Sequence, residues 1–209
     1  MVRVSIKLDR TLFPLTFIEL TTSLEKLGFE ISSELPFPRP RGRFIGTGNI
    51  ARKGNFTIQI DAGSQAIGMI GPLLESTIDE LDSFLNTLKR DYSVDFDEFA
   101  KYYQLVSHYE YKTVKNAYTK INDFFSHPKL DELSKIVEIP IKTFSFKVGL
   151  ADVLPNGINW FDMQFSPDEK RNDGYAINIV YRNENRETYR NFISHIEEKI
   201  MKSIQLIEG

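Results

Sequence analysis

Short segments in which apolar and polar residues alternate, separated by residues typical of turns, constrain the fold of this chain more than any other feature. In residues 2–8 every second residue is apolar and the residues between them are polar or charged, as in a half-buried β-strand. Because such strands have one apolar face, we expect an antiparallel sheet that is covered on one side. The same pattern predicts further strands at residues 29–35, 43–51, 55–62, 65–70, 102–111, 139–148, 158–165 and 174–182.

Helical spacing of apolar residues fills the stretches between groups of strands. Leu74, Ile78, Leu81, Leu85 and Leu88 recur at intervals of four, three, four and three residues, as on one face of an α-helix. Because amphipathic helices of this kind cover an apolar sheet face, the predicted fold class is α+β: an antiparallel meander sheet with helices on one face. Similar stripes predict helices at residues 15–27, at 114–137 with an interruption near 126–128, and without interruption at 189–207.

The order strand, helix, meander of three or four strands, helix occurs twice along the chain. The boundary falls near Asp95, at an acidic connection. We therefore expect two similar α+β halves, residues 1–95 and residues 96–209, packed as one globular unit. The halves share no visible sequence, so that an internal duplication and a coincidence of two ordinary α+β units are both open.

The composition excludes several classes of protein. Apolar residues make up 41% of the 209 residues, which is enough for a substantial core, and the absence of cysteine rules out disulfides, thiolate metal sites and cysteine nucleophiles. No apolar run is long enough to span a membrane. Arg3, Lys7 and Arg10 lie where a secretory signal would need apolar residues. We therefore expect a cytoplasmic protein that does not associate with membranes.

Motifs for catalysis and cofactor binding are missing from the sequence. Gly42, Gly46, Gly48 and Gly54 are closely spaced, but Lys53 precedes a glycine, whereas in a P-loop the lysine follows one. The histidines form no spaced ligand set, no serine lies in a GxSxG elbow, and the acidic clusters fit solvated helix faces. We therefore expect no cofactor and no metal site, and the sequence favours a protein that is not an enzyme.

A run of basic residues without acidic neighbours is the first candidate binding surface. This basic stretch comprises Arg39, Arg41, Arg43, Arg52 and Lys53. Because arginine side chains and glycine N–H groups bind phosphates, the stretch predicts a contact with RNA, DNA or a nucleotide. The alternative is that these are solvated charges of loops and strand edges, which also discourage pairing between sheet edges.

The sheet face opposite the helices is the second candidate surface. Alternation places Trp160 and Gln164 on that face, and Lys147 and Arg182 join them from neighbouring strands. Trp160 would anchor a protein partner or help to hold a nucleic acid by stacking. The alternative is an ordinary solvated sheet face with a half-buried tryptophan. Because the formal net charge is −3, a protein partner is the preferred interpretation.

Three function classes follow from these surfaces. The leading hypothesis is a non-catalytic cytoplasmic binding or assembly protein that engages a protein partner or itself through the exposed sheet face. Residues 39–53 carry only basic charges and residues 75–98 mainly acidic ones, which suggests a homodimer. The alternatives are a nucleic-acid-binding protein that uses the basic stretch, and a ligand-binding or enzymatic pocket between sheet and helices.

Overall fold

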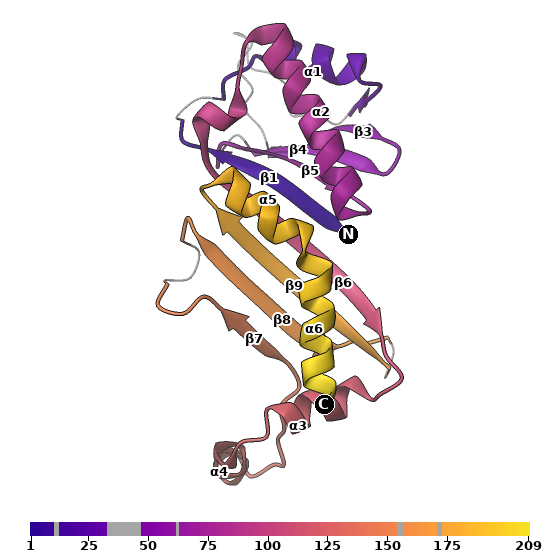
Figure 1. The fold of residues 1–209 in the computed structure, drawn as a ribbon, viewed down its shortest axis with the longest axis vertical. Helices are drawn as coiled ribbons and strands as arrows, with labels where there is room; N and C mark the ends of the chain where they lie inside the picture. The colour runs from indigo at the N-terminus through magenta and orange to yellow at the C-terminus, as the bar shows by residue number, and fades with distance from the viewer. Residues whose placement is uncertain (11–12, 33–46, 62, 154–156, 171–172) are drawn as a thin grey trace.

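The computed structural model describes residues 1–10, 13–32, 47–61, 63–153, 157–170 and 173–209. These residues form a nine-stranded antiparallel sheet with helices on one face, which confirms the predicted α+β class (Figure 1). The strands are β1 (Val2–Leu8), β2 (Glu30–Ile31), β3 (Thr47–Lys53), β4 (Phe56–Asp61), β5 (Ala66–Gly71), β6 (Ala100–Lys112), β7 (Phe146–Gly149), β8 (Trp160–Pro167) and β9 (Gly174–Asn183). The helices are α1 (Phe17–Lys26), α2 (Leu74–Tyr92), the 3₁₀ turn η1 (Phe96–Phe99), α3 (Ala117–Phe124), α4 (Pro128–Val137), α5 (Arg186–Ser194) and α6 (Ile196–Glu208).

The two halves of the chain contribute adjoining parts of the sheet. The strands lie in the order β2-β3-β4-β5-β1-β6-β9-β8-β7, so that β1 and β6 are neighbours at the junction (Figure 1). In each half the opening strand pairs with the last strand of its meander, β1 with β5 and β6 with β9. The halves thus share a spatial arrangement as well as an order of elements, while duplication of the sequence stays a prediction.

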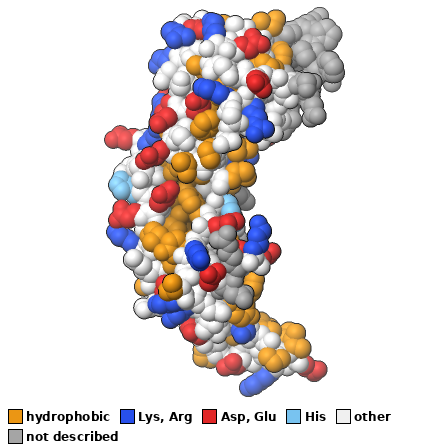
Figure 2. Space-filling view, turned by 90° about the vertical axis from the view of Figure 1, so that its right-hand side faces the viewer, with side chains coloured by type: hydrophobic (Ala, Val, Ile, Leu, Met, Phe, Trp, Pro, Cys, Tyr) orange, Lys and Arg blue, Asp and Glu red, His pale blue; other side chains and the backbone are white. Residues whose placement is uncertain are grey.

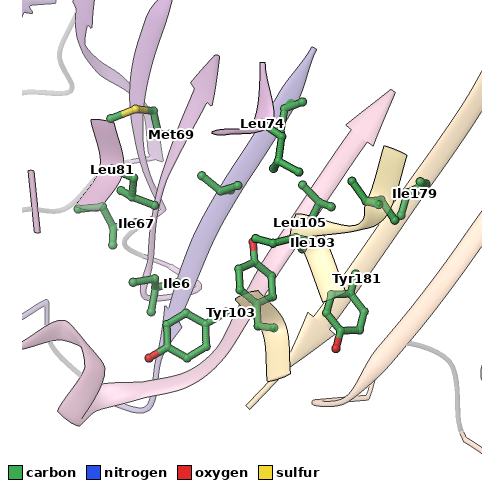
Figure 3. Packing of buried hydrophobic residues seen from close by; sticks show 14 of the residues in the cluster. Ile6, Ile67, Met69, Leu74, Leu81, Tyr103, Leu105, Ile179, Tyr181 and Ile193 are labelled. Carbon is green, nitrogen blue, oxygen red and sulfur yellow. The ribbon is translucent and has the colours of Figure 1, made fainter. Parts of the chain in front are cut away.

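Alternation along the strands separates a covered face of the sheet from an open one. Val4 and Ile6 of β1 are buried under the helices together with Ile67 and Met69 of β5. In Figure 3 this cluster continues across β1 into the second half, where Ile193 of α5 belongs to it. One hydrophobic core therefore spans both halves beneath α2, α5 and α6.

The last apolar stripe forms two helices, so the prediction of a single uninterrupted helix is wrong. α5 ends at Ser194, and α6 begins directly after His195. The backbone N–H of His195 donates to the carbonyl of Phe192 at 3.3 Å, three residues back instead of the four of an α-helix. The carbonyl of Asn191 accepts instead from Ser194 Oγ at 3.0 Å and lies 2.9 Å from His195 Nδ1. These two side chains thus take the place of the missing backbone hydrogen bond. The spacing of the apolar residues is the same on both sides of the break, so the sequence pattern does not reveal it.

The helix predicted at residues 114–137 is interrupted as expected. α3 ends at Phe124, and α4 begins at Pro128, whose fixed φ suits the first turn of a helix. His127 caps α4, because its Nδ1 accepts the N–H of Lys129 at 3.1 Å. α4 has no buried residue and extends from the end of the second half (Figure 1).

Both edge strands are shorter than predicted. β7 covers only the last part of the strand predicted at residues 139–148. Before it, the N–H of Ile141 donates to Ser134 Oγ of α4 at 3.1 Å, so that this segment bonds to a helix and not to β8. β2 is likewise only the beginning of the strand predicted at residues 29–35, of which 33–35 lie outside the described residues. An alternating pattern does not reveal which neighbour an edge segment will bond to.

Candidate functional site

The uncovered side of the sheet carries most of the predicted site residues that the structure describes. The helices lie in front of the sheet in Figure 1, and the side view in Figure 2 shows a crescent whose concave side is opposite to them. We call this side the open face. Cross-strand pairing places on it Glu30, Arg52, Thr57, Gln59, Asp61, Gly68, Ile70, Arg3, Ser5, Lys7, Tyr102, Gln104, Val106, His108, Glu110, Lys112, Asn178, Val180, Arg182, Trp160, Asp162, Gln164 and Lys147.

Cations outnumber carboxylates among the described residues of the open face, although the whole chain has a formal charge of −3. The cations are Arg3, Lys7, Arg52, Lys112, Lys147 and Arg182, and the carboxylates are Glu30, Asp61, Glu110 and Asp162. Two of the cations, Arg3 and Lys7, lie on β1 at the centre of the sheet. The open face is therefore the basic side of an acidic protein.

Ion pairs neutralise every cation of α1, α2 and α5 on the helix side, and they also hold Lys53 of β3 and Lys202 of α6. These pairs are Lys26–Asp91, Lys53–Glu80, Lys89–Asp95, Arg90–Asp91, Arg186–Asp82, Arg186–Asp97, Arg190–Asp82 and Lys202–Glu198. On the open face, by contrast, Arg3, Lys7 and Arg52 form no ion pair with any residue that the structure describes. Nε of Arg3 is in addition buried without a hydrogen-bond partner in the described part of the chain. The charges of these three side chains are thus not neutralised by an ion pair within the described chain.

Trp160 lies on the open face as predicted, but it is buried, with 7% of its surface exposed. Its indole N–H donates to Asp162 Oδ2 at 2.8 Å, and Lys147 Nζ lies 3.1 Å from the same oxygen. The indole ring also lies close to Gly149 of β7: a Cβ atom at this position would be 3.5 Å from Trp160 Cη2. Trp160 therefore stabilises the sheet and presents little surface to an external partner.

Arg182 is held in place by two neighbours on the open face. Its Nε donates to Gln104 Oε1 at 2.7 Å, and its guanidinium carbon lies 5.2 Å from the centre of the Tyr102 ring. Gln164 is half-buried and lies between Asn178 and Lys147 in the cross-strand register. The structure thus gathers Lys147, Trp160, Gln164 and Arg182 on one face, as the sequence predicts.

The basic stretch divides between the two sides of the sheet. Arg52 is exposed on the open face, where its Nε donates to the carbonyl of Gly54 at 2.8 Å. Lys53 points to the helix side, pairs with Glu80 at 2.7 Å and lies 5.5 Å from the ring centre of Phe29. Successive strand residues point to opposite faces, so Lys53 cannot join Arg52 in one patch. Arg39, Arg41 and Arg43 lie outside the described residues.

Sequence reasoning missed Arg3 and Lys7 as site residues. Their alternation with apolar residues is visible in the sequence, and it correctly placed them on the solvent side of a strand. What was missing was the strand order, which puts β1 in the middle of the sheet and these two cations at the centre of the open face. Their position depends on pairing with residues about sixty to one hundred places away.

Between sheet and helices lies a small cavity of about 20 Å³, enough for about one water molecule. Asp82, Arg186 and Arg190 line it together with Tyr103 and Tyr189. A wider groove of about 840 Å³ opens between α2 and the α5–α6 junction, on the outside of the helix layer. No group of three or more potential metal ligands occurs among the described residues. No described helix has both the length and the apolar character needed to cross a membrane.

Comparisons with protein-family models, curated proteins and solved structures give no match for this chain.

Proposed function

We propose that the protein is a non-catalytic, cytoplasmic nucleic-acid-binding protein that holds the sugar-phosphate backbone against its open face. The observation that carries this proposal is the unequal neutralisation of charge. Arg3, Lys7 and Arg52 lack ion-pair partners in the described chain, whereas every cation of α1, α2 and α5 on the helix side has one. Because phosphate neutralisation dominates the affinity of proteins for nucleic acids, unpaired cations on a concave surface favour a polyanionic ligand.

Polar side chains next to these cations support the same function. Gln59, Gln104 and Asn178 on the open face offer amide donors and acceptors that can contact bases or sugars. The ring of Tyr102, half-buried beside Arg182, offers a stacking surface. The face therefore combines charge, hydrogen bonding and one aromatic ring.

A protein partner, or a second copy of the chain, is the second candidate occupant of the open face. It is favoured by a cross-strand row in which the apolar side chains Ile70, Val106 and Val180 flank Arg3. The burial of Trp160 weakens this candidate, because a buried tryptophan cannot insert into a partner as an anchor.

Fluorescence anisotropy with labelled single-stranded RNA, single-stranded DNA and duplex DNA at low salt tests the proposal. The variant Arg3→Ser/Lys7→Ser/Arg52→Ser removes the unpaired open-face cations. The matched control Lys26→Ser/Lys53→Ser/Lys89→Ser removes the same charge from ion pairs on the helix side.

We expect the open-face variant to lose at least about tenfold in affinity and the control to lose less than about twofold, because loss of local phosphate contacts costs more than a change in net charge. Equal losses in both variants, or no binding by the wild type, would overturn the proposal. Light scattering of the same proteins addresses the second candidate: a dimer that dissociates only in the open-face variant would assign the face to self-association.

A further inference from the structure

At the end of β1, the edge of the open face contains several cations around an open cavity. The cavity has a volume of about 850 Å³ and lies where β1 ends. Its lining contains one carboxylate and several cationic side chains. The lining residues are Lys7, Leu8, Asp9, Arg10, Gly63, Gln65 and Lys101.

A β-bulge brings Lys101 to this cavity. Lys7 pairs with Tyr102, but Leu8 pairs with Ala100, so that Lys101 is an extra residue without a partner on β1. Leu8 and Ala100 face the hydrophobic core, and regular alternation of β6 would have placed Lys101 and not Ala100 on that side. Bulges re-aim side chains in this way and are common beside functional sites.

The backbone around the cavity is fixed by hydrogen bonds. The N–H of Leu8 donates to the carbonyl of Gln65 at 2.8 Å, and the N–H of Asp9 donates to the carbonyl of Phe99 at 2.8 Å. Gln65 has a φ of 53°, in the left-handed region that residues other than glycine rarely adopt. The surrounding contacts thus hold a costly conformation at the rim of the cavity.

The cations of the cavity form no direct ion pair in the described chain. Lys7, Arg10 and Lys101 form no ion pair with any described residue, and the guanidinium carbon of Arg10 lies 3.2 Å from the centre of the Phe99 ring. Burial lowers the pKa of Lys7, and the charge of Lys101 lowers it further, while Asp61 acts in the opposite direction. Charged Lys7 therefore carries a cost of burial that a bound anion beside it would offset.

We propose that Lys7, Arg10 and Lys101 bind a phosphate monoester, namely the phosphorylated end of a nucleic-acid strand that lies on the open face. This inference rests on the proposed function and specifies its ligand. A terminal phosphate carries up to two negative charges and three acceptor oxygens, which three cationic donors can match, whereas an internal phosphodiester carries one charge.

The position of the cavity also favours a strand end. Lys7 is the last residue of β1 that pairs with both neighbouring strands, with Tyr102 on one side and with Ala66 on the other. A nucleic-acid strand that runs along β1 on the open face would therefore reach the edge of the sheet here, beside the ring of Tyr102.

Two oligonucleotides of the same sequence, one with a 5′-phosphate and one with a 5′-hydroxyl, test this site by anisotropy, and a 3′-phosphorylated oligonucleotide tests the other end. We expect the wild type to bind one phosphorylated form at least about tenfold more tightly, as a charge-assisted contact allows. Lys101→Gln should abolish this ratio and change the affinity for the hydroxyl form less than about twofold. Lys112→Gln, the same change near the other end of β6, should retain the ratio.

An equal affinity for phosphorylated and hydroxyl ends in the wild type would overturn the site, as would a ratio that survives Lys101→Gln. Inorganic phosphate, followed by ³¹P NMR, separates this failure from failure of the proposed function. If no oligonucleotide binds but phosphate does so in a Lys101-dependent way, the open-face proposal and the strand-end ligand both fail and only an anion site remains. If oligonucleotides bind without any preference for a phosphorylated end, the proposed function stands and this inference fails.

Discussion

The indole N–H of Trp160 donates a 2.8 Å hydrogen bond to Asp162, two residues further along the same strand and on the same face of the sheet. Both side chains are buried, and Lys147 completes the group from β7. This contact turns the predicted anchor for a partner into an internal brace of the outer strands.

Replacing the brace should therefore destabilise the fold. We expect Trp160→Phe to lower the free energy of unfolding by about 1–3 kcal/mol, because it removes a buried hydrogen bond and part of a packed ring. Urea unfolding followed by circular dichroism measures this change. Gln164→Ala on the same strand, where the side chain is half-buried, serves as the control and should cost less. An unchanged stability of Trp160→Phe would show that the indole contributes nothing to the sheet.

Gly68 marks a close approach between β5 and β1. A Cβ atom at this position would lie 2.7 Å from both Ser5 Cβ and the carbonyl oxygen of Val4, so that the backbone itself would have to move. We expect Gly68→Ala to lower the free energy of unfolding by about 1–3 kcal/mol. The control Gly63→Ala places its Cβ at 3.4 Å from Asp61 Oδ1 and should change stability by less than about 0.5 kcal/mol. Thermal unfolding compares the two variants, and equal melting temperatures would contradict the expectation.

Asp82 connects the halves by accepting hydrogen bonds from Arg186 and Arg190 of α5. All three side chains are partly exposed, so we expect Asp82→Asn to cost only about 1 kcal/mol. The cost should shrink in 1 M salt, because exposed charges are screened there. Glu198→Gln, which breaks an exposed pair with Lys202 within α6, should cost less than about 0.5 kcal/mol. A loss for Asp82→Asn that does not depend on salt would contradict an electrostatic link.

Burial raises the pKa of Tyr175 to about 12, with a smaller contribution from Glu208. A tyrosine in the unfolded chain has a pKa of about 10. The stabilising contribution of neutral Tyr175 is therefore complete below about pH 10 and declines as the pH rises to about 12, because the unfolded chain releases the proton first.

Tyr175→Phe should accordingly make the free energy of unfolding fall less steeply with pH across this alkaline range. The change in slope should correspond to the release of about one proton. At neutral pH the substitution should cost little, because the hydroxyl has no hydrogen-bond partner among the described residues. Urea unfolding at a series of pH values measures the slope. An unchanged alkaline slope would contradict the assignment.

Salt dependence offers an independent check on the open face. If Arg3 neutralises a phosphate, Arg3→Ser should reduce the slope of the logarithm of affinity against the logarithm of salt concentration by about one. Lys53→Ser should leave the slope unchanged, because Lys53 is paired with Glu80 on the helix side. An equal change of slope in both variants would indicate an effect of net charge alone.

Local patterns in the sequence were sufficient for the fold class and for the faces of the long strands. The alternation along β8 correctly separates Trp160 and Gln164 from Phe161 and Phe165. The alternation does not predict how deeply Trp160 is buried, because its ring lies against Gly149 of another strand.

The central charges of the candidate site could not be located in the same way. Lys7 owes its position to pairing with both Ala66 and Tyr102, and Lys101 owes its direction to a bulge in that pairing. The periodicity of a strand predicts neither which strand it will pair with nor where the pairing register will shift. The pairing of Lys53 with Glu80 is likewise a contact between distant segments.

Within the sheet, the two halves meet along the ladder between β1 and β6. A chain cut between the halves, near residue 95, would therefore leave each fragment with a freshly exposed strand edge whose N–H and C=O groups have lost their partners. Such an edge pairs readily with any similar edge, including one from another molecule. The seam within this sheet thus makes either half on its own prone to aggregation, however well its own meander is formed.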